Sequence, residues 1–431
     1  MAHPVTVAAE AASAAFPAWA ALGPTIRRAM LNRAADALEK RADRFVELMA
    51  TEVRASEPWA RFNVMLGCGI IREAAALTTQ IGGEVIPSDK PGVLALALRE
   101  PVGVILGIAP WNAPVILGCR AIAMPLACGN SVILKASERC PKTHALITEA
   151  FADAGLPKGV VNLVTNPPED AASVVGALID HPAVRRINFT GSTAVGKIVA
   201  LRAAAQLKPV LLELGGKAPL IVLEDADLGE AVAAAAFGAF MNAGQICMST
   251  ERLIVVDSVA DEFARRLAEK AQAMPAPAVG MQIDEAAQAS VAALIDDALG
   301  HGARRIASGS AAVIDAVTPI MRLYHDESFG PVVGIIRVAD EEEAIRVAND
   351  SAYGLSASVF TSDTARGLKV ARRIRSGICH INGPTVADEP QMPFGGTGAS
   401  GYGRFGGKAG IDAFTELRWI TIAGEPGHYP I

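Results

Sequence analysis

The stretch NFTGSTAVGKIVA, residues 188–200, indicates how this chain folds. It begins with strand-forming residues, turns through Gly-Ser-Thr and continues as a helix. Gly191 and Gly196 permit a tight turn, and Ser192 stands where the N-terminus of a helix offers free N–H groups to a phosphate. A turn with a capping serine explains the same residues equally well. The stretch lacks the GxGxxG pattern of the usual dinucleotide fold.

Apolar runs and helical stretches alternate on both sides of this turn. Strands are predicted over residues 102–109, 131–136, 160–165, 185–191 and 209–216, and helices over residues 142–154, 171–180 and 194–205. Continuous Val, Ile and Leu runs separated by helices are typical of a parallel sheet covered on both faces. The pattern restarts after Gly216, with strands over 218–223 and 251–257 and helices over 227–242 and 260–274. A second α/β domain is therefore expected.

The remaining segments are predicted from weaker patterns. Apolar spacing predicts helices over residues 24–55 and 58–79, two strands around a turn within 82–101, and an edge strand over 414–422. The run PVILGC, residues 114–119, is interpreted as a buried strand that follows a turn at Asn112. Residues 273–288 and 307–319 are rich in Ala, Pro and Gly and give only weak strand signals.

Composition excludes several classes of protein. Hydrophobic residues make up 51% and charged residues 19% of the 431 residues, which excludes a disordered chain. The net charge of −6 argues against a nucleic-acid partner, and the long apolar run around residue 110 is interrupted by prolines and Asn112, which argues against a membrane span. The six cysteines form no CxxC pair and no metal-ligand spacing, so no metal is expected. Free thiols without a signal peptide predict a cytoplasmic protein.

Five polar residues stand at points where strands end or turns begin. Cys247, in NAGQICMST, follows a glycine and small polar residues, which suggests a nucleophile on a bent backbone rather than a packed thiol. Glu213, in LLELGGK, is either a partly buried general base or an ion-paired glutamate. Asn112 could donate to an oxyanion or simply form a turn. Lys135 and Glu138, in SVILKASE, lie where parallel sheets bind ligands, although a solvated pair explains them too.

The combination of these residues, in this order, resembles the aldehyde dehydrogenase superfamily. The matching stretches are APWNAP, ILKASE, FTGSTAVG, LELGGKAP, GQICMST, ESFGPV, YGLSASVF, INGP and PFGGTGASGYGR, and they extend from about residue 100 to 420. Within the superfamily the sequence is most similar to the bacterial salicylaldehyde and vanillin dehydrogenases. Two departures are visible: an N-terminal strand pair of the family is absent, and the segment from Cys247 to Glu327 is shorter than usual.

The resemblance implies an α/β fold with a Rossmann-type NAD-binding domain, a second α/β catalytic domain and a small β oligomerisation arm. The NAD-binding domain would comprise residues 1–79 and 101–214, the catalytic domain residues 215–414, and the arm residues 80–100 and 415–431. Apolar edge strands seldom stay unpaired. The arm therefore implies a homo-oligomer, either a dimer or a tetramer.

The resemblance also assigns roles to residues. Cys247 would attack the aldehyde, Asn112 and the Cys247 N–H would stabilise the oxyanion, and Glu213 would activate water to hydrolyse the resulting thioester. NAD would be the cofactor, preferred over NADP because Glu138 would repel a 2′-phosphate. The residues implied in binding NAD are Pro110, Trp111, Lys135, Ser137, Glu138, Gly191, Ser192, Gly196, Leu214, Glu327 and Phe329.

The substrate expected from the resemblance is an aromatic aldehyde, and the sequence feature that bears on it is Arg120. This arginine lies in an apolar stretch, so it either forms a structural ion pair with an acidic residue or lines the aldehyde pocket and donates to a ring hydroxyl. Alternatives are an aliphatic aldehyde or semialdehyde, a CoA-acylating relative, a non-redox cysteine acyltransferase or hydrolase, and a non-catalytic binding protein. No motif supplies the histidine that a Cys–His hydrolase needs, and Glu213 favours hydrolysis to a free acid.

Overall fold

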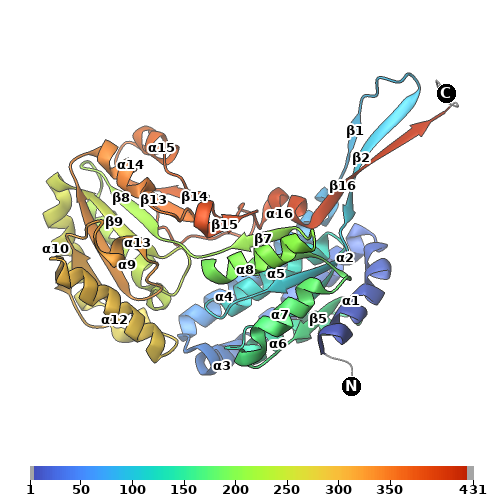
Figure 1. Ribbon diagram of the computed structural model, residues 1–431, viewed down its shortest axis with the longest axis horizontal. Helices are drawn as coiled ribbons and strands as arrows, with labels where there is room; N and C mark the ends of the chain where they lie inside the picture. Colours follow the sequence, from blue (N-terminus) through green and yellow to red (C-terminus); the bar gives the residue numbers. More distant parts are fainter. Residues whose placement is uncertain (1–3, 425–431) are drawn as a thin grey trace.

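The alternating strands and helices form two large sheets, and a third, small sheet projects from them (Figure 1). The computed structural model describes residues 4–424. The first large sheet has the order β15-β7-β6-β3-β4-β5 and is parallel except at β15. Its strands are β3 (Val104–Ile108), β4 (Ser131–Lys135), β5 (Val161–Val164), β6 (Val184–Thr190), β7 (Val210–Glu213) and β15 (Gly401–Tyr402).

Helices cover both faces of this sheet, as expected for strands that are apolar throughout. Alternate residues of β3 point to opposite faces: Leu106 belongs to the core beneath one set of helices and Ile105 to the core beneath the other. One face carries α1 (Pro4–Ala20), α7 (Ala171–Asp180) and α8 (Thr193–Ala205). The other carries α2 (Pro24–Glu39), α3 (Ala42–Val53), α4 (Glu57–Leu77), α5 (Pro114–Ala127) and α6 (Pro141–Asp153).

The second large sheet has the order β10-β11-β12-β9-β8-β13-β14 and is parallel except between β10 and β11. Its strands are β8 (Ala218–Val222), β9 (Thr250–Val256), β10 (Arg304–Ala307), β11 (Ala312–Asp315), β12 (Val332–Val338), β13 (Ser356–Phe360) and β14 (Ile378–Ile381). Its helices are α9 (Leu228–Phe240), α10 (Asp257–Ala273), α11 (Ala276–Val279), α12 (Glu285–Gly300), α13 (Arg322–His325), α14 (Glu341–Asn349) and α15 (Thr364–Ala371).

The third sheet is the projecting arm at the upper right of Figure 1. It consists of β1 (Glu84–Ile86), β2 (Val93–Pro101) and β16 (Thr415–Ala423) in antiparallel order. The segment before β16, comprising β15 and α16 (Gly407–Phe414), returns to the first sheet, where β15 pairs with β7. Residues 1–3 and 425–431 of the predicted ranges lie outside the described residues. Within residues 4–424, no helix combines the length and apolar character that crossing a membrane requires.

Three predicted elements differ from the structure. The run PVILGC is the start of helix α5 and not a strand; α5 is buried on every side, so its sequence has no periodicity that distinguishes the two. The single helix predicted over residues 24–55 is two helices, with a break at Lys40 and Arg41 where Arg41 turns to bind Asp153 at the end of α6. Helix α12 begins at the end of the weakly patterned segment 273–288 and continues through residues for which no element is predicted.

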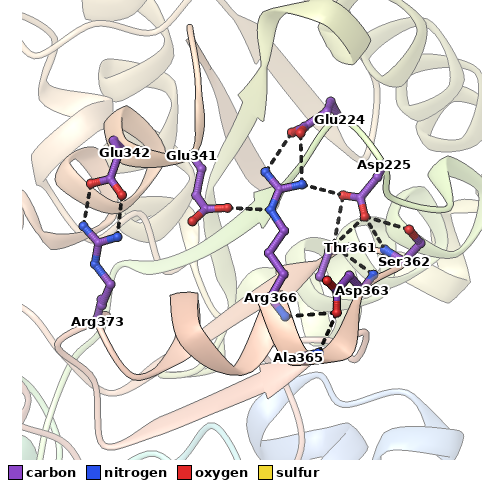
Figure 2. A network of polar contacts seen from close by, with 10 residues as sticks. All are labelled: Glu224, Asp225, Glu341, Glu342, Thr361, Ser362, Asp363, Ala365, Arg366 and Arg373. Carbon is purple, nitrogen blue, oxygen red and sulfur yellow. Dashed lines mark hydrogen bonds and ion pairs between the residues drawn. The ribbon is translucent and has the colours of Figure 1, made fainter.

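An ion-pair network lies past the carboxyl ends of β8 and β13 in the second sheet (Figure 2). Arg366 on α15 binds Glu224 and Asp225, which follow β8, and Glu341, at the start of α14. Asp225 also accepts hydrogen bonds from Thr361 and Ser362, which follow β13. Parallel sheets often bind ligands at this edge. Here the polar side chains that follow β8 and β13 bind one another and Arg366.

Candidate active site

The predicted site residues meet between the two large sheets. Asn112 and Glu213 lie just past or at the carboxyl ends of β3 and β7 in the first sheet. Cys247 and Glu327 lie just before the amino ends of β9 and β12 in the second sheet. Only residues 214–217 connect β7 to β8, so the two sheet edges are held against each other at this point. Residues far apart in sequence thereby line one cavity.

Cys247 is held on a tightly bent loop. The residues before it, Asn242, Ala243 and Gly244, all have positive φ angles, of 50°, 55° and 70°. Left-handed backbone at non-glycine residues costs about 1–3 kcal/mol each and persists only where surrounding contacts hold it. The Gln245 side chain supplies such contacts, because it donates to the carbonyls of Asn242 and Met281 at 3.0 Å each. The loop thus presents the thiol to the cavity, and the Cys247 N–H donates to no group among residues 4–424.

Glu213 is fully buried, and neither of its carboxyl oxygens has a hydrogen-bond partner within the described chain. Burial raises the pKa of this carboxyl to about 7, and the interaction with the Cys247 thiol opposes the shift. Burial and the nearby Glu213 carboxylate in turn raise the pKa of the Cys247 thiol well above its ordinary value. At neutral pH the pair therefore consists of a neutral thiol beside a carboxyl group that is partly ionised.

Asn112 is fixed by hydrogen bonds at its backbone carbonyl and at its side-chain amide. Its backbone carbonyl accepts from the Trp59 indole at 3.0 Å and from the Asn242 amide at 3.2 Å. Its side-chain Nδ2 donates to the carbonyl of Gln245 at 2.9 Å. An amide nitrogen carries two hydrogens, so one N–H remains to donate into the cavity.

Two cavities adjoin at this place. The one beside Cys247 has a volume of about 330 Å³, and both Glu213 and Asn112 line it together with Leu117, Thr190 and Phe329. It shares Pro110, Trp111 and residues 190–192 with a second cavity of about 580 Å³ that extends between α7 and α8. No histidine is among the residues that line the smaller cavity in the described chain. The arrangement suits an elongated ligand that reaches Cys247 with one end.

The larger cavity contains the residues predicted to bind the adenosine end of a dinucleotide. Lys135 and Glu138 line it and form an ion pair with each other, and Asn166 donates to the same Glu138 oxygen at 3.1 Å. Burial alone would raise the Glu138 pKa, but the bond from Lys135 lowers it below its usual range. Ser137 also lines the cavity, and its N–H donates to His144 at 3.0 Å. The Lys135–Glu138 pair presents both a donor and an acceptor to hydroxyl groups of a ligand.

The glycine-containing turn, at residues 190–192, lines both cavities. Ser192 caps α8, and its hydroxyl accepts from the Val195 N–H at 3.4 Å. A Cβ atom at Gly191 would stand 2.5 Å from the Phe189 ring, and one at Gly196 would stand 2.4 Å from Leu214. Gly196 lines neither cavity and packs against Leu214, whereas Leu214 lines the cavity beside Cys247 and Gly191 lines both cavities.

Glu327 and Phe329 approach from the second sheet. The Glu327 carboxylate accepts from the Gly216 N–H at 2.9 Å, and burial together with the nearby Glu251 raises its pKa to about 8. A Cβ atom at Gly215 would stand 2.3 Å from this carboxylate. Phe329 has a φ of 46°, and its ring packs edge-on against Trp111 with centroids 5.9 Å apart. Both side chains line the cavity beside Cys247.

Arg120 has the buried acidic partner that the sequence alone did not identify. Its guanidinium donates to Asp388 at 2.6 Å, and both side chains are less than a tenth exposed. The guanidinium also lies 4.3 Å from the centroid of the Phe394 ring. Leu117, one helical turn earlier, lines the cavity beside Cys247, whereas Arg120 lines a small separate hollow. Its charge nevertheless acts on both Glu213 and Cys247.

Sequence reasoning missed a buried ion pair next to the site. Lys217 binds Glu251 at 2.5 Å, and both side chains are almost wholly inaccessible. The signal was available, because Glu251 and Arg252 are charged residues at the start of the apolar run of β9. Thr190 and Gly215, which line the cavity beside Cys247, were also not singled out.

Comparison with known proteins agrees with this arrangement. The sequence matches the Aldehyde dehydrogenase family over residues 2–420. It is 57% identical to a vanillin dehydrogenase of Pseudomonas fluorescens (98% of this chain, 91% of the relative) and 39% identical to an NAD(+) benzaldehyde dehydrogenase of Pseudomonas putida (99% and 90%). The fold superimposes with a TM-score of 0.97 on a salicylaldehyde dehydrogenase of Pseudomonas putida G7 complexed with salicylaldehyde (48% identity; 99% and 91% covered). The chain therefore belongs to the aldehyde dehydrogenase family.

Proposed function

We propose that this protein oxidises aromatic aldehydes to carboxylic acids, with NAD as the cofactor. The observation that carries the proposal is the convergence of Cys247, Glu213 and Asn112 on one cavity of about 330 Å³ that continues into a second of about 580 Å³. A thiol, a general base and an oxyanion donor are the groups that aldehyde oxidation through a thioester requires. The adjoining cavity provides room for the cofactor.

In the proposed reaction the Cys247 thiol loses its proton to solvent, and the sulfur attacks the carbonyl carbon. The resulting oxyanion is stabilised by the Asn112 side chain and the Cys247 N–H, and one such donor is typically worth about 3–4 kcal/mol. A bound nicotinamide ring would supply the acceptor for the hydride that leaves the substrate carbon. Cys247 is then acylated, and Glu213 removes a proton from the water that attacks the thioester, which releases the acid and the Cys247 thiolate.

For the cofactor, Lys135 and Glu138 would bind the adenosine ribose with support from Ser137, and Ser192 at the start of α8 would bind the pyrophosphate. Glu327 would bind the nicotinamide ribose beside Phe329, with Pro110, Trp111 and Leu214 packing along the dinucleotide. We propose NAD rather than NADP because a 2′-phosphate would stand near the Glu138 carboxylate. The benzaldehyde dehydrogenase relative, whose name specifies NAD(+), is consistent with this choice.

For the substrate, two observations favour an aromatic ring. The cavity beside Cys247 has apolar walls, including Leu117, Trp111 and Phe329, which suit a flat ring. The vanillin, salicylaldehyde and benzaldehyde dehydrogenases to which the chain is similar are all named for aromatic aldehydes. We propose Arg120 as a substrate-specificity residue that acts on a ring hydroxyl, for which its guanidinium would have to turn from Asp388 toward the cavity beside Cys247.

The setting of the reaction follows from the same features. All six cysteines are free thiols, which favours a reducing compartment such as the cytoplasm. The projecting arm exposes Val85, Leu417 and Trp419, so we propose that two or more copies of the chain associate through it.

The test is to follow NADH absorbance with benzaldehyde, vanillin, salicylaldehyde and short aliphatic aldehydes, each with NAD and NADP. Aromatic substrates with NAD should give the highest kcat/KM. The Cys247→Ser variant serves as the control, because a hydroxyl is a far weaker nucleophile than a thiol and should leave almost no turnover. A preference for aliphatic aldehydes would contradict the substrate, and equal kcat/KM for both cofactors would contradict the role of Glu138.

A further inference from the structure

Glu251 is a buried carboxylate whose hydrogen bonds all go to one loop and one lysine. It lies in the second residue of β9 and is 3% exposed. The N–H of Ser328 donates to its two oxygens at 2.9 and 2.8 Å, the Ser328 hydroxyl donates at 2.8 Å, and the N–H of Phe329 donates at 3.2 Å. Hydrogen bonds to a charged acceptor in a buried place are among the strong ones in proteins.

This loop carries the two side chains that face Cys247 from the second sheet. Glu327 precedes Ser328, and Phe329 follows it. Phe329 has a φ of 46°, in the left-handed region that a bulky residue seldom adopts. Strained backbone persists only where surrounding contacts hold it. The Glu251 carboxylate, which binds the N–H groups of both Ser328 and Phe329, supplies those contacts.

Lys217 provides the opposite charge and joins the loop to the first sheet. Its ammonium group donates to Glu251 at 2.5 Å and to the Ser328 hydroxyl at 3.3 Å. The preceding residue, Gly216, donates its N–H to Glu327 at 2.9 Å. The consecutive residues Gly216 and Lys217 thus bind the carboxylates of Glu327 and Glu251 respectively. The ion pair keeps Lys217 bound to Glu251, and Glu327 remains directed into the cavity.

We propose that Glu251 is a positioning residue that fixes the Glu327–Phe329 loop for the nicotinamide end of the cofactor. This inference rests on the proposed function, because it takes the cavity beside Cys247 as the place of the nicotinamide. Glu251 touches neither substrate nor cofactor and acts through the backbone of Ser328 and Phe329. Without it, the strained loop relaxes, and Lys217 is released next to Glu327.

The test is Glu251→Gln, measured with two ligands that differ in reach. NADH occupies both cavities, whereas AMP occupies only the adenosine end between α7 and α8. The variant should raise the Kd for NADH and the KM for NAD by about 10- to 100-fold, the range expected for losing one or two charge-assisted hydrogen bonds, while the inhibition constant of AMP changes by less than about twofold. Kd is measured by quenching of protein fluorescence and does not depend on turnover.

Two further variants separate positioning from general destabilisation. Asp315→Asn removes another buried carboxylate from the same sheet, where Asp315 binds Arg337 and Arg304, and should leave both ligands unaffected. Lys217→Met combined with Glu251→Leu removes the pair without leaving a buried charge alone, so the protein should fold and still bind NADH weakly.

The inference is overturned if a folded Glu251 variant binds NADH as the unmodified protein does, or if the NADH and AMP affinities fall together. The proposed function fails in a different way. An unmodified protein that binds NADH but oxidises no aldehyde would contradict that function and leave the NADH and AMP comparison intact as a measure of loop positioning.

Discussion

At the scale of single residues, the chemistry depends on a carboxyl group that the fold buries without a partner. Glu213→Gln keeps the size of the side chain and removes its ability to accept a proton. Because hydride transfer precedes hydrolysis, the variant should release one equivalent of NADH rapidly and then turn over about 10²–10⁴-fold more slowly. Stopped-flow absorbance checks this. Loss of the burst itself would show that Glu213 is needed earlier, to take the proton of Cys247.

The pKa of Glu213 also predicts how turnover depends on pH. Burial raises this pKa to about 7, so the protonated form dominates at lower pH, and the carboxylate that acts as a base accumulates as pH rises through 7. The hydrolysis of the thioester should therefore accelerate from pH 6 to pH 8 and then level off. A kcat that falls over this interval, measured with saturating substrate in a constant-ionic-strength buffer, would contradict the assignment of Glu213 as the base.

Arg120 can be tested against its buried partner. If it recognises a ring hydroxyl, Arg120→Ala should lower kcat/KM for salicylaldehyde more than for benzaldehyde, by about 1.5–3 kcal/mol for a charge-assisted hydrogen bond. Removal of Arg120 alone leaves the buried Asp388 carboxylate unpaired, which destabilises the fold. The double variant Arg120→Met with Asp388→Asn removes both charges and therefore controls for this loss of stability. An equal loss for both aldehydes would leave Arg120 with a structural role only.

At the scale of secondary-structure elements, the sequence was informative for several helices and strands that are bounded by clear turns. The ranges predicted for α7, α8 and β3 agree with the structure to within two residues. Helix α5 was interpreted as a strand because all of its residues are buried, and a wholly apolar segment shows neither helical nor alternating periodicity. Pro114 at its first turn was the available signal.

The candidate site was predictable in its residues but not in its pairings. The positions of Cys247, Glu213 and Asn112 follow from motifs that lie at strand ends. By contrast, the partner of Arg120, which is 268 residues away, and the Lys217–Glu251 pair depend on tertiary contacts that local sequence does not encode. The break between α2 and α3 at Lys40 and Arg41 was likewise not predicted.

The turn between β7 and β8 gives a prediction at this scale. A Cβ atom at Gly215 would stand 2.3 Å from the Glu327 carboxylate, so Gly215→Ala must displace that side chain from the cavity. We expect kcat/KM for NAD to fall by about tenfold or more while the fold is retained. Gly300→Ala is the control, because a Cβ atom there meets nothing within 4 Å and should affect only helix stability. Steady-state kinetics and thermal denaturation compare the two variants.

At the scale of the whole molecule, the arm gives the remaining prediction. Leu417 and Trp419 are 64% and 77% exposed on β16, and residues two apart on a strand share a face. If copies associate through this face, Trp419→Ser should raise the dissociation constant of the oligomer by about tenfold or more. Sedimentation velocity over a range of concentrations measures this. Ile320→Ser, at an equally exposed position outside the arm, should have no effect.

The four residues that connect β7 to β8 have a consequence for how the protein can be divided. Glu213 is the last residue of the strand before this connection, and Cys247 lies in the segment after it. A cut within residues 214–217 would leave the base on one fragment and the nucleophile on the other. The fragment before the cut would keep all the residues that line the larger cavity, but it would lack Cys247. Neither fragment would hold both groups that the proposed hydrolysis of a thioester needs.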